Sequence, residues 1–204
     1  KTPSYIPQIA FYFLTGHKDA ANKLTLFGKI AHHSNGQDGN FYTDDGKVNL
    51  QSGNFATNYL ELGFLQSSYS QNLKAFKFIK SSFEIHPKSW MLEELQGQYS
   101  GLRWHNTFLA YKLPMKTNPL PNEKQRANFS IKAETTIMLD NFNNWNYFDA
   151  KRLNASLILY YHPKFLEDIG FFVQFYHGMD YYNIYFQHQI SSIRFGIMTE
   201  TLRF

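Results

Sequence analysis

His32 and Ser34 are the two residues whose types and spacing most clearly suggest chemistry. They lie in the run Ile30-Ala31-His32-His33-Ser34-Asn35-Gly36-Gln37. Two residues make one full period of a β-strand, so both side chains point the same way, with Cα atoms roughly 6.5 to 7 Å apart. An imidazole beside a hydroxyl is the pairing with which serine hydrolases activate their nucleophile. The spacing therefore predicts a nucleophilic pair at a strand end.

The residues that lead up to this pair indicate its surroundings. The even-numbered positions carry Leu24, Leu26 and Ile30, so His32 and Ser34 continue an apolar face. Such a face is an unusual place for the nucleophile of a water-soluble hydrolase. It suits an enzyme whose substrate is the lipid bilayer.

Strand-length segments separated by turn-forming clusters predict an all-β fold for the whole chain. A helical period is visible only around Trp90 to Leu95. The length of 204 residues predicts a single domain over 1–204. Nine strands are expected, over residues 6–15, 23–34, 54–66, 72–85, 100–113, 126–139, 150–162, 169–178 and 191–203.

The sixth expected strand alternates cleanly, with Phe129 and Ile131 on one face and Lys132 and Glu134 on the other. A soluble barrel would turn the apolar face inward, and a membrane barrel would turn it outward. The longest apolar run, residues 9–14, is far shorter than the ~20 residues of a membrane helix, whereas a spanning strand needs only ~9 to 11. Alternation alone does not choose between the two barrels.

Composition narrows the function classes. The 20 Phe and 14 Tyr suit the aromatic girdles of a membrane barrel. The absence of cysteine excludes disulfides and thiolate metal sites. The net charge of +4 comes from scattered Lys and Arg, which argues against nucleic acid as a partner. The last residue, Phe204, resembles the terminal aromatic signal of outer-membrane barrels.

Three stretches together resemble the outer membrane phospholipase A family of Gram-negative bacteria. These are Ser4-Tyr5-Ile6-Pro7-Gln8, the motif His32-His33-Ser34-Asn35-Gly36, and Arg194-Phe195-Gly196-Ile197 running to Phe204. The resemblance implies an antiparallel transmembrane β-barrel, twelve-stranded in the family, in the bacterial outer membrane. The nine expected strands match the family's last nine, so its N-terminal strands are expected to be missing here.

The resemblance also assigns roles to residues. It makes Ser34 the nucleophile, His32 the base and an asparagine the group that orients the imidazole. Asn58 is the preferred asparagine because it opens the next strand on the same face as Leu60. Asn54, four residues earlier, is also at an even-numbered position and stays the alternative. The backbone N–H of Gly36 is the expected oxyanion donor.

A calcium cofactor, phospholipid substrates and pairing of two copies also follow from the resemblance. Asp38, a few residues past the serine, is the expected acidic ligand of Ca²⁺. The implied activity is hydrolysis of acyl esters in phospholipids and lysophospholipids, by a homodimer. Glu200 stands where relatives present an apolar contact, which weakens the inference of a dimer.

Two alternatives remain open from the sequence. The first is a non-catalytic outer-membrane barrel that serves as a structural or accessory subunit of a membrane complex. The second is a soluble lipid-binding barrel with its apolar faces turned inward. Labelling of Ser34 by a serine-reactive sulfonyl or phosphonate probe would argue against the first alternative, and solubility without detergent would favour the second.

Overall fold

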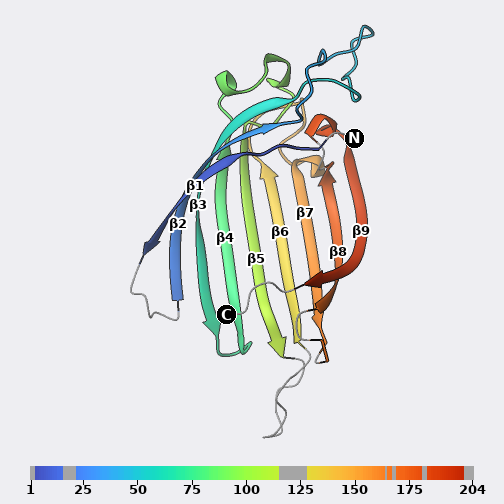
Figure 1. The fold of residues 1–204 in the computed structure, drawn as a ribbon. Helices are drawn as coiled ribbons and strands as arrows, with labels where there is room; N and C mark the ends of the chain where they lie inside the picture. The colour runs from blue at the N-terminus through green and yellow to red at the C-terminus, as the bar shows by residue number, and fades with distance from the viewer. Residues whose placement is uncertain are drawn as a thin grey trace, which may run out of the picture.

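A computed structural model describes residues 3–15, 22–114, 128–163, 165–166, 169–180 and 183–199. In these residues nine strands form one antiparallel sheet in which each strand pairs with its neighbours in sequence (Figure 1). No helix among them is long and apolar enough to cross a membrane. The strands are β1 (Gln8–Thr15), β2 (Asn22–Ser34), β3 (Ala56–Ser70), β4 (Ala75–Ile85), β5 (Leu102–Pro114), β6 (Asn128–Met138), β7 (Leu153–His162), β8 (Ile169–Met179) and β9 (Gln189–Thr199).

The all-β prediction and the nine expected strands are confirmed, with shifts at the ends. The third strand begins two residues later than expected and continues to Ser70, because it pairs along most of β4. The short helical pattern is two 3₁₀ turns, η1 (Lys88–Trp90) and η2 (Glu93–Leu95), in the loop between β4 and β5. Residues 200–204, which include Glu200 and Phe204, lie outside the described residues.

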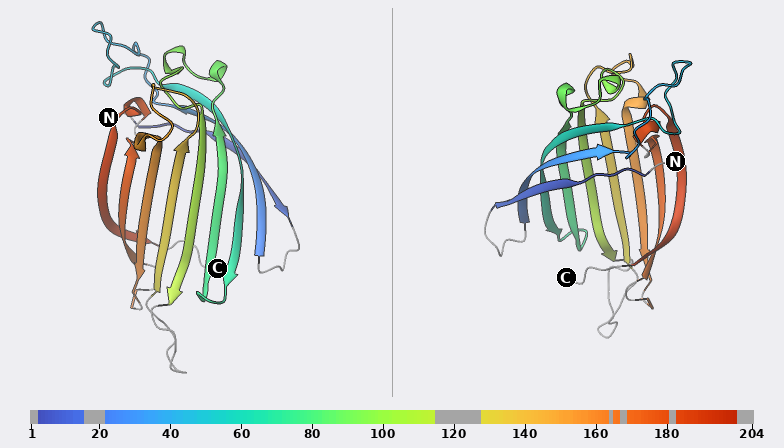
Figure 2. Two further views of the ribbon diagram at one scale, coloured as in Figure 1. Left: turned by 180° about the vertical axis from the view of Figure 1, so that it is seen from behind. Right: turned by 45° about the horizontal axis from the view of Figure 1, so that its top comes forward.

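The sheet curves strongly, as the three ribbon views show (Figures 1 and 2). Its edge strands are β1 and β9, and these two strands are not paired with each other. The structure therefore establishes a curved antiparallel sheet.

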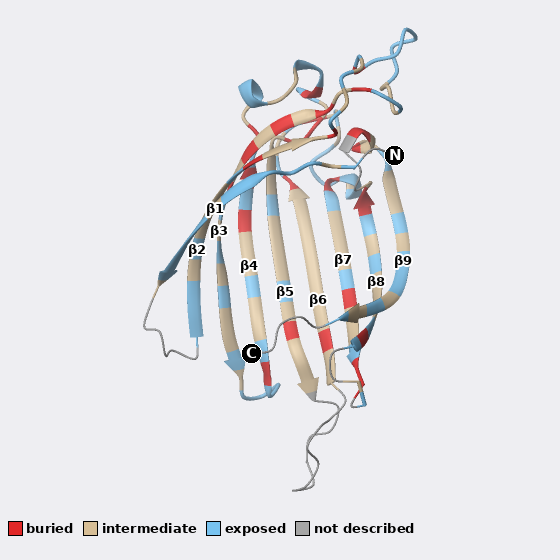
Figure 3. Cartoon of the chain, in the orientation of Figure 1, coloured by how far each residue is buried: buried red, intermediate tan, exposed pale blue. Residues whose placement is uncertain are grey.

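The two faces of the sheet differ in chemistry and burial. Figure 3 marks how buried and exposed residues are distributed along the strands. On β3, Leu62 is 58% exposed whereas its neighbour Glu61 is 2% exposed. We call the face of Leu62 the outer face and that of Glu61 the inner face. The soluble barrel with inward apolar faces does not fit this arrangement. The outer face carries exposed apolar side chains on β2 (Leu24, Leu26, Ile30), β3 (Leu62, Phe64), β4 (Phe83, Ile85), β8 (Phe171, Phe175) and β9 (Ile193, Phe195, Ile197).

Three loops pack together at the end of the sheet where β2 ends and β3 begins. Phe55 at the start of β3 is fully buried among side chains from the β2–β3 loop, the β4–β5 loop and the segment before β9. This packing gives the loops around Ser34 a hydrophobic core of their own. Its buried members are Phe41, Phe55, Leu95, Tyr99, Ile184 and Phe186.

Candidate functional site

His32 and Asn58 face each other across β2 and β3. Their Cα positions are direct partners in the antiparallel register, so both side chains lie on the outer face. His32 Nδ1 lies 2.8 Å from Asn58 Oδ1. Because a carbonyl oxygen can only accept, Nδ1 carries the proton and donates it. The Nε2 atom of a neutral His32 is then a free base, as a nucleophile's partner requires.

The Asn58 amide is oriented from its other side by the β4–β5 loop. Asn58 Nδ2 donates to the backbone carbonyl of Trp90 at 3.3 Å. The same loop pairs with the start of β3, where the Leu92 N–H donates to the carbonyl of Ala56 at 3.1 Å. The Trp90 carbonyl therefore selects the amide orientation in which Oδ1 faces His32.

Ser34 is the last residue of β2 and shares the outer face with His32. Its backbone pairs with Tyr5, with N–H···O distances of 2.8 and 3.0 Å. No hydrogen bond joins the Ser34 hydroxyl to the His32 ring in the described part of the chain. Hydrogen bonds of this kind often tighten only when substrate binds. The structure thus brings His32 and Asn58 into contact and leaves Ser34 beside them.

The turn after Ser34 is built by Asn35, which the sequence interpretation gave no role. Its buried amide donates to the Gly53 carbonyl at 2.7 Å and accepts from the N–H of Phe55 at 3.0 Å and of Gln37 at 3.2 Å. These bonds hold the backbone on both sides of Gly36. Only the bond with Gln37 was signalled in the sequence, since the side chain of a turn asparagine bonds the backbone two residues on.

Gly36 occupies a position that only glycine accepts without strain. Its φ is +66°, and a Cβ built there would lie 3.0 Å from the Tyr5 ring. No acceptor for the Gly36 N–H is found among the described residues. The exposed turn can therefore present this donor to an oxyanion.

Asn54, the alternative orienting residue, lies outside β3 and does not contact the His32 ring. Its backbone N–H donates to the Gly39 carbonyl at 2.9 Å. The register places Asn58, four residues later, opposite His32. Parity alone could not distinguish the two, because residues four apart on a strand share a face.

In the structure, the expectation of a calcium site rests on a single carboxylate, that of Asp38. Asp38 is exposed, and no three His, Asp or Glu side chains gather as a metal site in the described residues. Asp45, further along the loop, is engaged by Lys47 at 2.7 Å and by Thr43, which hold the pKa of its carboxyl below the usual range. Calcium takes about six to eight oxygens. Calcium binding at Asp38 therefore stays a prediction.

A second histidine and serine meet on the outer face, at His177 of β8 and Ser191 of β9. His177 Nδ1 lies 2.8 Å from Ser191 Oγ, and both residues are exposed. The structure records no carboxamide or carboxylate that holds the other nitrogen of His177 among the described residues. The pair is a natural comparison for the site at His32.

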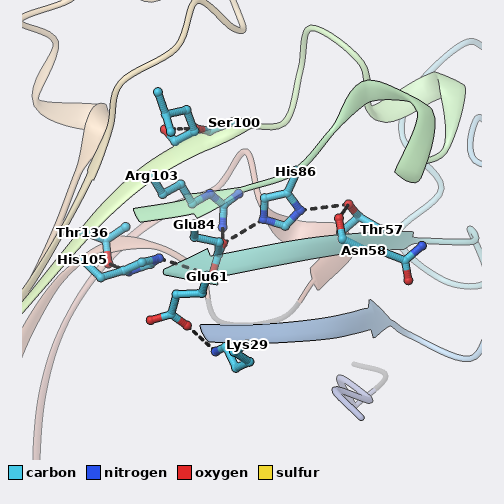
Figure 4. A network of polar contacts seen from close by, with 12 residues as sticks. Lys29, Thr57, Asn58, Glu61, Glu84, His86, Ser100, Arg103, His105 and Thr136 are labelled. Atoms are coloured by element: carbon cyan, nitrogen blue, oxygen red, sulfur yellow. Dashed lines mark hydrogen bonds and ion pairs between the residues drawn. The ribbon is translucent and has the colours of Figure 1, made fainter. Parts of the chain in front are cut away.

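The inner face behind the site holds a polar network (Figure 4). Glu61 is bound by Lys29, by Lys80 at 2.8 Å and by the Ser82 hydroxyl at 2.6 Å. We call this group the Glu61 cluster. On β6, Lys132 and Glu134, which the sequence alternation places on the polar face, form an ion pair at 2.8 Å.

A second group, the Glu84 cluster, lies nearer to the loops. Glu84 accepts from His86 Nε2 at 2.8 Å and lies 3.5 Å from Arg103 Nη1. The guanidinium of Arg103 stacks 4.0 Å from the centre of the Tyr99 ring. Buried charges of this kind persist because each is paired.

Comparison with known proteins adds no relationship: no protein-family model matches the chain, and neither a curated protein nor a solved structure matches it significantly.

Proposed function

We propose that this chain is a phospholipase, an acyl-ester hydrolase that acts on phospholipids and lysophospholipids from within a bacterial outer membrane. The single observation that supports it most is the hydrogen bond between His32 and Asn58 on an exposed apolar face. Ser34 lies one strand period beyond His32 on that face. A hydrolytic site in this position meets lipid directly.

In the proposed reaction, Ser34 Oγ attacks the ester carbonyl carbon while its proton moves to His32 Nε2. Asn58 Oδ1 accepts from Nδ1–H and keeps the imidazolium in place. The Gly36 N–H binds the oxyanion. His32 then gives its proton to the glycerol oxygen as the ester bond breaks. A water, deprotonated by His32, attacks the acyl-Ser34 carbonyl; as the acyl bond breaks, His32 returns the proton to Ser34 Oγ and the fatty acid is released.

The distribution of side chains supports the membrane placement. Phe195 of β9 is 86% exposed, and exposed apolar residues are found on the strands at both edges of the sheet, β1 and β2 as well as β8 and β9. Contiguous apolar surface of this kind marks a contact with membrane or protein. The charged residues Lys29, Glu61, Glu84 and Arg103 are aligned across four strands on the inner face, as charged residues are in membrane barrels. A twelve-stranded barrel, completed by further strands between β1 and β9, is part of the proposal.

Calcium and pairing of two copies are linked in the proposal. Asp38 is the residue of this chain that would hold the ion, and the remaining oxygens would come from a second copy. When bound, the cation would add positive charge near the oxyanion. The acyl transfer described above runs entirely through the chain's own residues.

The decisive experiment measures hydrolysis of a phospholipid by the full-length protein, including any strands outside residues 1–204, in detergent, for wild type, Ser34→Ala and Ser191→Ala. We expect Ser34→Ala to abolish release of fatty acid and Ser191→Ala to leave it unchanged. A serine-reactive sulfonyl probe should label Ser34 alone. Equal activity of wild type and Ser34→Ala would refute the proposal.

A second candidate function is that of a non-catalytic barrel subunit in a membrane complex. The observation that favours it is the missing hydrogen bond between the Ser34 hydroxyl and the His32 ring. In that case the probe should leave Ser34 unlabelled, while the chain should remain stably folded with a partner in the membrane.

A further inference from the structure

His86 is a buried histidine directly behind the candidate site, on the inner side of β3. The residue is 3% exposed, and it directly follows Ile85, the last residue of β4. One ring nitrogen, Nδ1, lies 2.9 Å from Thr57 Oγ1, and the other, Nε2, lies 2.8 Å from Glu84 Oε1. Figure 4 shows His86 between Thr57 and Glu84, with Asn58 next to Thr57 on the strand.

The partners of His86 determine which nitrogen carries the proton. A carboxylate only accepts, so Nε2–H donates to Glu84. Nδ1 then holds a lone pair and accepts from the Thr57 hydroxyl. Burial lowers the pKa of His86, against the opposing effect of Glu84, and this favours the neutral form of the ring. The Thr57–His86 bond is therefore directional and leaves the Thr57 side chain fixed.

Thr57 links this buried ring to Asn58. It precedes Asn58 on β3, and it forms an isolated bridge with Met91 of the β4–β5 loop. His86 itself begins that loop, where its backbone N–H donates to the Gly101 carbonyl at 2.8 Å. The ring thus ties the start of β3 to the loop whose Trp90 carbonyl orients the Asn58 amide.

We propose that His86 is a positioning residue for the hydrolytic site, acting through Thr57 on the alignment of Asn58 between the Trp90 carbonyl and His32. This inference rests on the proposed function for its kinetic consequence. Its structural consequence, a fixed His32–Asn58 bond, holds whether or not the chain hydrolyses lipid. A displacement of about 1 Å at a catalytic group costs roughly a hundredfold in rate.

Two substitutions separate this role from simple pairing with Glu84. In His86→Asn, the side-chain amide reaches the place of Nδ1 and can still bind Thr57. In His86→Gln, the amide reaches the place of Nε2 and can still bind Glu84 but not Thr57. We expect His86→Asn to keep near wild-type kcat and His86→Gln to lower kcat roughly ten- to a hundredfold, with KM unchanged.

Thr57→Val removes only the hydroxyl and provides an independent check. Its loss of kcat should equal that of His86→Gln, and neither change should lower activity further when combined with Asn58→Ala. Retained activity in His86→Gln together with loss in His86→Asn would overturn the proposal, because pairing with Glu84 would then be the essential contact. Fully additive losses with Asn58→Ala would overturn it too.

A readout without turnover keeps this test separate from the proposed function. In protein with ¹⁵N-labelled histidine, the Nδ1–H of His32, assigned with His32→Gln, should be protected from exchange. We expect that signal to persist in His86→Asn and to disappear in His86→Gln and Thr57→Val. Its persistence in all three would overturn the positioning role. A chain that shows the expected signals but no hydrolysis would refute only the phospholipase proposal.

Discussion

The two faces of β3 present opposite chemistry within a few residues. On the outer face, Asn58 contacts His32 at the head of a row of exposed apolar side chains. On the inner face, Thr57 and Glu61 are buried in hydrogen bonds and ion pairs. Leu62 of the outer face is 58% exposed, whereas Glu61 beside it on the inner face is 2% exposed. The comparison teaches that the ionic interior holds the strand while the apolar exterior carries the candidate chemistry.

The largest effect that would sharpen this comparison is expected at His32. His32→Ala removes the base, and we expect phospholipid hydrolysis to fall roughly 10⁴-fold or more, because nucleophile and base act as a unit. The matched control is His177→Ala, which breaks the other outer-face His–Ser pair and should leave the rate unchanged. Initial rates of fatty acid release check both. Equal losses would contradict a single site.

Asn58 should give the next largest effect. Asn58→Ala leaves the His32 ring without its acceptor, and we expect kcat to fall roughly a hundredfold with little change in KM. Asn54→Ala, which alters the asparagine that does not contact His32, is the control and should retain wild-type kcat. Steady-state kinetics on one phospholipid compares the pair. A larger loss in Asn54→Ala would reverse the assignment.

Substitutions on the inner face should lower the free energy of unfolding more than substitutions on the outer face. Glu61→Ala leaves Lys29 and Lys80 without their shared carboxylate, and we expect the free energy of unfolding to fall by about 3 kcal/mol. Leu62→Ala, next to it on the outer face, should change it by about 0.5 kcal/mol or less. Urea unfolding in detergent, followed by tryptophan fluorescence, measures both. Similar losses would mean that the faces contribute alike.

The smallest effect concerns calcium at the edge of the outer face. If Asp38 binds the ion, Asp38→Asn should raise the Ca²⁺ concentration needed for half-maximal hydrolysis by about tenfold, since one charged ligand of about six to eight is lost. Asp44→Asn, an exposed acid in the same loop, is the control. The rate of hydrolysis, measured while Ca²⁺ is titrated in from excess chelator, gives the curve for each of the two variants. Hydrolysis that is independent of Ca²⁺ would remove the ion from the proposal.

Much of the fold was predictable because strand periodicity is local. Alternation with a period of two located all nine strands and placed His32, Ser34 and Asn58 on one face. Strand ends were less accurate, since pairing partners extend or shorten a strand. The β3 strand, for example, continues to Ser70 because β4 offers a partner along that length.

The supporting residues of the site could not be predicted in the same way. The Trp90 carbonyl that accepts from Asn58 lies 32 residues further along the sequence, in the β4–β5 loop. Every residue has a backbone carbonyl, so the residue type at position 90 does not indicate this contact. His86 meets Thr57 across 29 residues of sequence, and no local pattern around His86 indicates that contact. Asn35 stood in the motif, yet its partners Gly53 and Phe55 are brought to it only by the folded loop.

The sequence by itself determined which residues share a face, because that follows from the geometry of one extended strand. It also determined that His32 and Ser34 are neighbours on an apolar face. Only the tertiary structure decided that this face points outward, that Asn58 rather than Asn54 meets His32, and that buried charges lie behind them. These depend on strand register and sheet curvature, which arise from contacts between distant segments.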